Sequence, residues 1–130
     1  MDVRRFKVLY LPGLMSGLIL CAILWLTLAP QPIGDIEPPL FEGADKLVHA
    51  VMFGALAWSM CRDWALWRGR RPNAAVVLIF GCLSALIGTG IEYLQAWMDT
   101  GRTFEAADIV ADSVGAIGTA VVLVFCMRFY

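Results

Sequence analysis

Four long apolar runs constrain this chain more than any other feature of its sequence. A helix of about 20 apolar residues, at about 1.5 Å per residue, crosses the hydrocarbon core of a bilayer. Prolines, glycines and charged residues separate the runs, and these residue types end helices. Hydrophobic residues make up 60% of the chain and charged residues 16%, whereas soluble domains average about 45–50% and about 25%. The pattern predicts an all-α polytopic membrane protein, a four-transmembrane-helix bundle.

The predicted spans cover residues 8–29, 45–67, 74–98 and 106–127, all within one domain over residues 1–130. The first apolar run is longer than the roughly 7–15 residues of a cleaved signal peptide, so we expect it to stay in the protein as a span. The second span is the least apolar, and it crosses only with Trp64 and Trp67 in one membrane interface. Thr103 is the expected N-cap of the fourth span.

Basic residues set the expected orientation. With four spans, the two termini and the loop between the second and third spans share one side of the membrane. Eight of the ten Lys and Arg residues lie on that side, and the positive-inside rule places it in the cytoplasm. We therefore expect a multi-pass protein of the cytoplasmic (inner) membrane with both termini inside. The net charge of -1 gives no reason to expect a nucleic-acid partner.

Polar residues then converge at the outer side, because the second span begins there, the third ends there and the fourth begins there. Ionisable side chains inside a span are costly, and they mark functional sites by default. Residues four apart on a helix share a face, which pairs Asp45 with His49 and Asp108 with Asp112. The candidate catalytic residues are His49, Glu92 and Asp108; the candidate ligand-binding residues are Asp45, Lys46, Gln95, Arg102 and Asp112.

Several interpretations of this cluster stay open at the level of sequence. In a structural one, Lys46 and Arg102 pair with the carboxylates and only hold the helices in register. In a functional one, the two cations bind an anionic group of an envelope lipid or lipid-linked glycan. An enzyme would use His49 as general acid or base, oriented by Asp45 or Glu92. The chain offers no recognised nucleophile, so whether it is an enzyme stays undecided.

Other chemistry is weakly indicated. One imidazole among carboxylates, without HExxH-like spacing, argues against a metal site, and we expect no metal and no cofactor. Four short spans leave little room for a transport pathway in one copy of the chain, and the oligomeric state is open. One cysteine lies in each apolar run, and we expect all four to be small packing residues. Glycines and alanines along the third and fourth spans predict close packing of helices within the chain.

Three segments together resemble the VanZ-like family of small bacterial membrane proteins: DKLVHAVMFGALA (45–57), IEYLQ (91–95) and GRTFEAADIVADSVGAIG (101–118). The resemblance implies a role in the bacterial cell envelope and a link to resistance against teicoplanin-type glycopeptide antibiotics. Asparagine is frequent in the family at the position of Asp112, so this residue departs from the family pattern, and the resemblance supports a charged role for Glu92 and Asp108 more than for Asp112. Fold and motif transfer with a family more safely than a particular function does.

Overall fold

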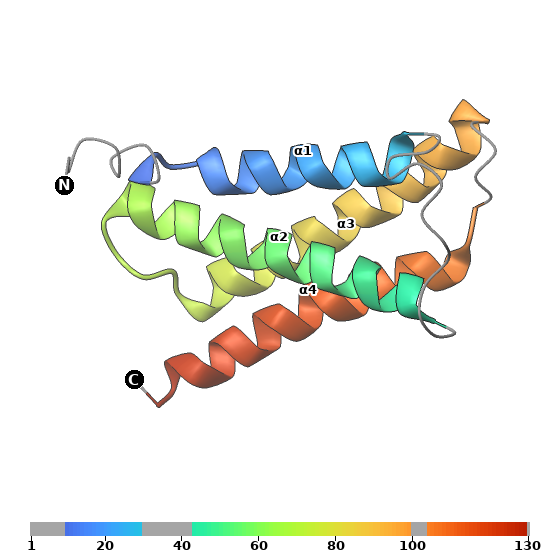
Figure 1. Cartoon of the computed structure of the whole chain (residues 1–130). Coiled ribbons are helices and arrows are strands. Elements are labelled where there is room, and N and C mark those ends of the chain that lie inside the picture. The colour runs from blue at the N-terminus through green and yellow to red at the C-terminus, as the bar shows by residue number, and fades with distance from the viewer. Residues whose placement is uncertain (1–9, 30–42, 100–103, 130) are drawn as a thin grey trace.

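A computed structural model describes residues 10–29, 43–99 and 104–129 of the chain. These residues form four helices: α1 (Leu14–Leu28), α2 (Ala44–Arg68), α3 (Ala74–Met98) and α4 (Ala106–Met127). No strand occurs within the described ranges, so the predicted all-α class is confirmed. The helices run lengthwise with alternating direction (Figure 1).

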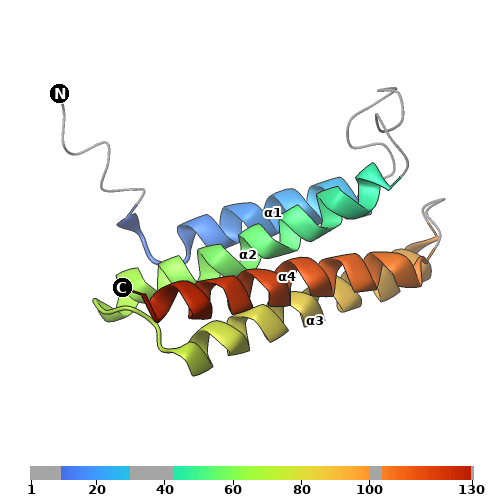
Figure 2. The same cartoon turned by 90° about the horizontal axis from the view of Figure 1, so that it is seen from below.

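The packing order places α2 and α3 in the middle. Helices α2, α3 and α4 contact one another pairwise, and α1 packs on α2 and α3. Figure 2 shows α1 and α4 on different sides of α2. One end of the molecule holds the end of α2 and the start of α3; we call it the basic end, because Arg68, Arg70 and Arg71 lie there. At the other, acidic end, α2 and α4 begin and α3 ends (Figure 1).

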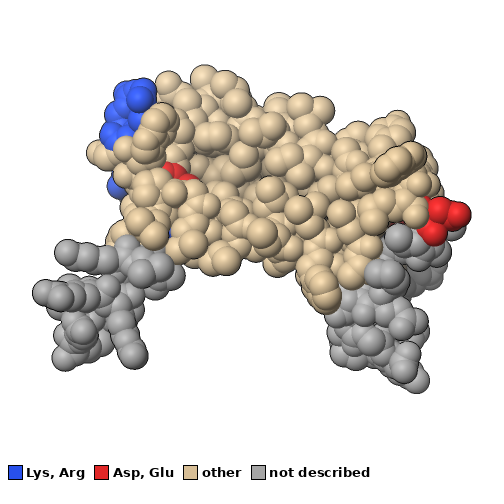
Figure 3. Space-filling view, turned by 90° about the horizontal axis from the view of Figure 1, so that it is seen from above, with Lys and Arg blue, Asp and Glu red and all other residues tan. Residues whose placement is uncertain are grey.

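A long uncharged surface separates these ends. Figure 3 shows the visible basic side chains at one end, with a small acidic patch beside them, and an acidic group at the opposite end. Helices α3 and α4 are long and apolar enough to cross a membrane, with mean hydropathies of 2.3 and 2.2 in their most apolar windows. Only 33% and 17% of those windows are buried. Core helices of a soluble protein would be mostly buried, so the exposed apolar surface indicates a membrane protein.

The predicted helix bounds are confirmed for α3 and α4, and α2 extends one residue further at each end than expected. Asn73 caps α3, because its side-chain oxygen accepts a hydrogen bond from the backbone N–H of Val76. The N-cap of α4 is Glu105, whose side chain makes no capping bond. The N-cap expected at Thr103 was therefore misplaced, and Thr103 itself lies outside the described residues.

The first helix is shorter than predicted. It begins at Leu14, after Pro12 and a Gly13 in the left-handed region with φ of 86°. A residue with this backbone conformation cannot continue a helix, so the Pro12-Gly13 pair breaks the apolar run. The 15 residues of α1 give a length of only about 22 Å. The expectation of one continuous helix over residues 8–29 was wrong for this reason.

Both ends of α1 are held by polar side chains of other helices. The Asp63 carboxylate on α2 accepts hydrogen bonds from the backbone N–H and the hydroxyl of Ser16, at 2.8 and 2.6 Å. At the other end, the Gln95 amide on α3 donates to the backbone carbonyl of Thr27. Backbone groups in the first and last turns of a helix have no partners within the helix. Asp63 and Gln95 supply those partners from outside.

Small residues let α4 approach α2 and α3 closely, as the sequence predicted. A side-chain carbon on Gly115 would lie 2.0 Å from the backbone oxygen of Ala50, and one on Gly81 would lie 2.6 Å from the Ala120 side chain. Ser84 adds a buried hydrogen bond of 2.8 Å from its hydroxyl to the carbonyl of Phe53. The core beside these contacts includes Ile23, Phe53, Leu56, Ile91 and Ala116.

The cysteines are only partly as expected. All four are free thiols, but only Cys61 is buried in the core, against Val77 and Ala120. Cys21, Cys82 and Cys126 are exposed, so the prediction that all four serve as packing residues was wrong for three of them. Apolar residues on a membrane helix need no protein partner, because lipid covers them.

Candidate functional site

The acidic end gathers most of the predicted site residues from three helices. The first two turns of α2 supply Asp45, Lys46 and His49, the last turns of α3 supply Glu92, and the start of α4 supplies Asp108 and Asp112. Their side chains form two adjoining groups, one around Lys46 and one around His49. The sequence placed these residues at one level, and the structure shows which of them touch.

Lys46 lies at the centre of the first group. Its ammonium is 2.7 Å from a carboxylate oxygen of Asp45 and 2.6 Å from one of Asp108, and it also binds the Glu105 carboxylate. An ammonium has three N–H donors, and three carboxylates surround this one. Lys46 therefore neutralises acidic side chains of α2 and α4, which leaves no obvious donor for the phosphate or other anion expected at this residue.

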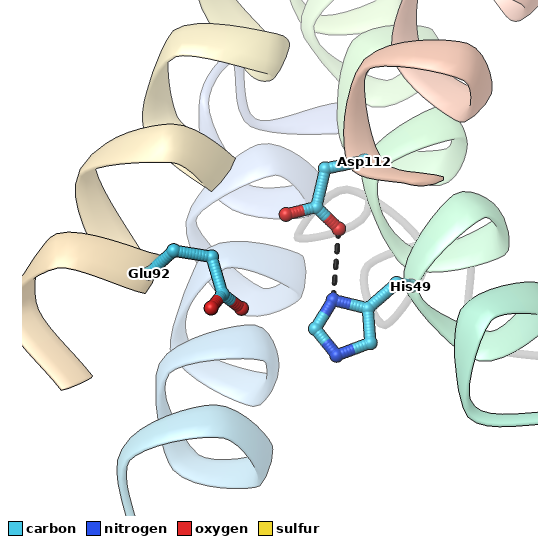
Figure 4. Close-up of side chains that lie close together, drawn as sticks. All are labelled: His49, Glu92 and Asp112. Carbon is cyan, nitrogen blue, oxygen red and sulfur yellow. Dashed lines mark hydrogen bonds and ion pairs between the residues drawn. The ribbon is translucent and has the colours of Figure 1, made fainter. Parts of the chain in front are cut away.

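His49 joins the second group to the first. Its Nδ1 lies 2.8 Å from Oδ1 of Asp112, and its Nε2 lies 3.9 Å from Oδ2 of Asp108. Figure 4 shows the Glu92 carboxylate directed toward this pair from α3. The partner that orients the imidazole is thus Asp112, whereas the sequence interpretation assigned this role to Asp45 or Glu92. Asp112, expected to matter less as a charge, is the direct partner of the only histidine.

Asp112 and Glu92 are both almost fully buried, with 1% of each residue exposed. Asp112 fits because it faces a glycine: a side-chain carbon on Gly88 would lie 2.7 Å from its Oδ2 and 2.8 Å from its Cβ. Any other residue at position 88 would collide with the Asp112 side chain. Gly88 therefore lets this carboxylate lie against the backbone of α3.

Among the described residues, one oxygen of Glu92 accepts a single, long hydrogen bond and the other accepts none. Oε2 accepts a hydrogen bond of 3.5 Å from the backbone N–H of Glu105. Oε1 is buried and makes no hydrogen bond within the structure. A buried carboxylate oxygen without a partner costs free energy, and native proteins keep very few of them. Oε1 of Glu92 therefore needs either a hydrogen-bond partner or ion from outside the described residues, or a proton on the carboxyl group.

Two predicted residues are not part of these groups in the described structure. Gln95 uses its amide to bind the carbonyl of Thr27, so its donor serves α1 instead of the site. Arg102 lies outside the described residues. Asp45 is at the rim, with 52% of its side chain exposed.

Glu105 was missed as a site residue, although it binds Lys46 and its backbone N–H approaches Glu92. A signal was available, since Glu105 precedes Asp108 by three residues, and residues at this spacing lie on one face of a helix. Asp63 was missed as well. Its only signal was a carboxylate beside Arg62, directly after the largely apolar stretch of residues 50–61.

The described part of the site carries more negative than positive charge. Five carboxylates face one ammonium and one imidazole: Asp45, Glu92, Glu105, Asp108 and Asp112 against Lys46 and His49. Carboxylates accept hydrogen bonds and attract cations. The site is therefore suited to a ligand with hydroxyl or amine donors, or to a cation.

An apolar groove adjoins the site along the same helices. It lies between α2 and α4, has a volume of about 520 Å³, and is lined by Ala50, Gly54 and Trp58 of α2 and by Gly115 and Thr119 of α4, among others. Ala50 follows His49 directly, and Gly115 is three residues beyond Asp112 on its helix. Polar and apolar surfaces thus meet along one edge of the α2–α4 pair.

A model of the VanZ/LLP1 family matches residues 14–127, which include all four helices. No curated protein and no solved structure matches the chain.

Proposed function

The chain belongs to the VanZ/LLP1 family, and from this premise we propose that it binds an envelope lipid or a lipid-linked glycan at the outer side of the bacterial cytoplasmic membrane. The observation that carries the proposal is the meeting of the polar groups with the apolar groove between α2 and α4. A lipid with a sugar headgroup is likewise polar at one end and apolar at the other, because its sugar carries hydroxyl donors and its tail is a hydrocarbon chain. The five carboxylates of the site supply acceptors for such hydroxyls.

The proposal includes a topology with four spans and both termini in the cytoplasm. The arginines at the basic end support this orientation, and the long uncharged surface between the two ends in Figure 3 supports a membrane-spanning arrangement. The acidic end then faces outward. A role in teicoplanin-type resistance belongs to the same proposal, because resemblance to the VanZ family implies it.

Cysteine labelling tests the topology. We expect a membrane-impermeant maleimide to label a cysteine introduced at Gly34 in intact cells, because the segment between α1 and α2 faces outward. A cysteine introduced at Arg71 should react only after the cells are broken, since the connection between α2 and α3 faces the cytoplasm. The parent protein, with its four native cysteines, supplies the background signal. Labelling in the opposite order would exclude the proposed orientation.

Two substitutions test the site itself. Glu92→Gln and His49→Asn keep the shape of each side chain approximately and remove its charge or its basic nitrogen. We expect both variants to insert and fold but to lose at least about 10-fold in retained lipid, which corresponds to about 1.4 kcal/mol of binding free energy. The measurement is native mass spectrometry of protein released from bacterial lipid nanodiscs.

Asp99→Asn is the matched control for this experiment. Asp99 is exposed at the end of α3, in the left-handed region with φ of 49°, a conformation that asparagine also tolerates. The control removes one charge near the same end and should retain lipid like the wild type. If Glu92→Gln and His49→Asn also retain lipid at the wild-type level, the polar groups serve only to hold the helices in register.

A second candidate function rests on the bond between His49 and Asp112. An ionised carboxylate only accepts hydrogen bonds, so Nδ1 donates to Asp112, and in the neutral imidazole Nε2 is then a proton acceptor. Nε2 is then able to take a proton from a water molecule or a ligand hydroxyl, as a general base does. This chemistry favours modification of the bound lipid over binding alone, and release of a product from supplied lipid would test it.

A further inference from the structure

We propose that His49, Glu92 and Asp112 bind one divalent transition-metal cation of the zinc class. The inference deepens the proposed function, on which it rests for access from the outer side of the membrane. It concerns the second polar group only. The reasons are the donor set, the charge and the burial of these three side chains.

The donor set is suitable in kind and in position. One imidazole nitrogen and one carboxylate oxygen from each acid lie within 4.8 Å of one another. Zinc takes imidazole nitrogen and carboxylate oxygen at about 2.0–2.2 Å, so tetrahedral ligands lie about 3.3–3.6 Å apart. The Nδ1 and Oδ1 atoms of His49 and Asp112 are 2.8 Å apart, so an ion would take the place of the Nδ1 proton and move the two atoms slightly apart, while the Glu92 side chain approaches them. Figure 4 shows its carboxylate facing the pair.

The three ligands come from three different helices. His49 is on α2, Glu92 on α3 and Asp112 on α4, and these helices contact one another pairwise. An ion among them would restrain all three at their outer ends. Three protein ligands also leave one position of a tetrahedral ion open, as catalytic zinc sites do. A water molecule or a headgroup oxygen would occupy that position.

Charge and burial distinguish this group from its neighbour. Asp45, Glu105 and Asp108 also lie within 4.8 Å of one another, but the ammonium of Lys46 already lies among them. Within the described ranges, no lysine or arginine pairs with Glu92 or Asp112. Both residues are 1% exposed, and Oε1 of Glu92 is buried without a hydrogen-bond partner. Buried carboxylates are normally paired or bound to metal.

A bound cation would also supply a partner for a phosphate-bearing headgroup, which the proposed function otherwise lacks. Lys46 is occupied by carboxylates, so the described residues offer little positive charge to a phosphate-bearing headgroup. A divalent ion on two carboxylates and a neutral imidazole would leave an open coordination position for an oxygen of that headgroup. The Asp112 side chain, one of the two carboxylate ligands, lies against Gly88.

Zinc titration of the purified protein tests the inference without any lipid. The full chain in detergent is stripped with a chelator and titrated with Zn²⁺ against a chromophoric competitor. We expect one high-affinity zinc per chain in the wild type and in the Asp99→Asn control. Glu92→Gln and Asp112→Asn should each weaken binding by at least about 100-fold, since loss of a residue that merely orients a ligand already costs about 10–100-fold.

X-ray absorption at the zinc edge identifies the ligands. We expect nitrogen and oxygen neighbours and no sulfur. Zinc–sulfur scattering would overturn the inference, because it would assign the ion to the cysteines. The same holds for a wild type without stoichiometric zinc, or for folded Glu92→Gln and Asp112→Asn variants with wild-type affinity. If a variant fails to fold, the stoichiometry and ligand set of the wild type decide the matter.

The lipid experiment remains a separate measurement. Lipid retained equally with and without chelator, by a protein that binds no zinc, would leave the proposed function standing and overturn the metal site. Stoichiometric zinc on nitrogen and oxygen ligands, with no lipid retained, would support the metal site and overturn the proposed function.

Discussion

Gly115→Ala is expected to prevent the close contact between α2 and α4. The added carbon would lie 2.0 Å from the backbone oxygen of Ala50 and 2.5 Å from its carbonyl carbon. Backbone atoms cannot rotate away as a side chain can, so the two helices must separate along their contact. Inserted carbons typically cost about 1–3 kcal/mol, and the backbone position puts this one at or above the top of that range. We expect little folded protein on size-exclusion chromatography in detergent, and a strongly lowered Tm for what remains.

Gly118→Ala is the matched control on the same helix. Nothing lies within 4 Å of a side-chain carbon at Gly118, so the substitution adds the same atom on an open face. Alanine is favoured over glycine within a helix by about 0.5–1 kcal/mol. The control should therefore fold as well as the wild type. A wild-type Tm for Gly115→Ala would show that α2 and α4 do not approach as closely as the structure places them.

Asp63→Ala is expected to release the start of α1 from α2. Asp63 is 5% exposed, and its carboxylate accepts two hydrogen bonds from Ser16 and one of 3.1 Å from Arg62. Alanine leaves the backbone N–H and the hydroxyl of Ser16 without this acceptor. A donor that loses its partner in a buried site costs about 1–3 kcal/mol, so we expect a loss of about 2–4 kcal/mol in the free energy of unfolding.

Two further variants show which hydrogen bonds of Asp63 account for the loss in the free energy of unfolding. Ser16→Ala removes only the hydroxyl and should cost about 1 kcal/mol. Asp63→Asn keeps one oxygen acceptor and should fall between Ser16→Ala and Asp63→Ala. The measurement is thermal unfolding in detergent, together with hydrogen exchange of the α1 backbone. Unchanged exchange in α1 for Asp63→Ala would contradict the role of Asp63 as an external cap.

The fold was predictable wherever sequence neighbours decide it. The bounds of α3 and α4 follow from apolar runs that stop at clear breakers, such as Pro72 with Asn73 before α3. The error at α1 shows the limit of counting apolar residues. Pro12 and Gly13 break the helix inside an apolar run, because backbone conformation and not hydrophobicity decides where a helix begins.

The sequence predicted most of the residues that belong to the site, but not which of them bind one another. Helix direction and the spacing of residues placed His49, Glu92, Asp108 and Asp112 at one end of the molecule, and the structure brings them there. The partner of His49 was assigned wrongly, and Glu105 was left out. Spacing along one helix says which residues share a face, but it does not say how far a neighbouring helix is rotated or shifted.

The sequence by itself determined that this chain is helical, that long apolar stretches of it remain exposed, and that its polar residues collect at helix ends. These properties depend on the residue types and on their order along one helix. The tertiary structure decided that Asp112 binds His49, that Lys46 is surrounded by carboxylates, and that Glu92 keeps a buried oxygen with no hydrogen-bond partner among the described residues. Those pairings depend on how closely the helices approach one another. Gly88 and Gly115 permit the close approach because they have no side chain.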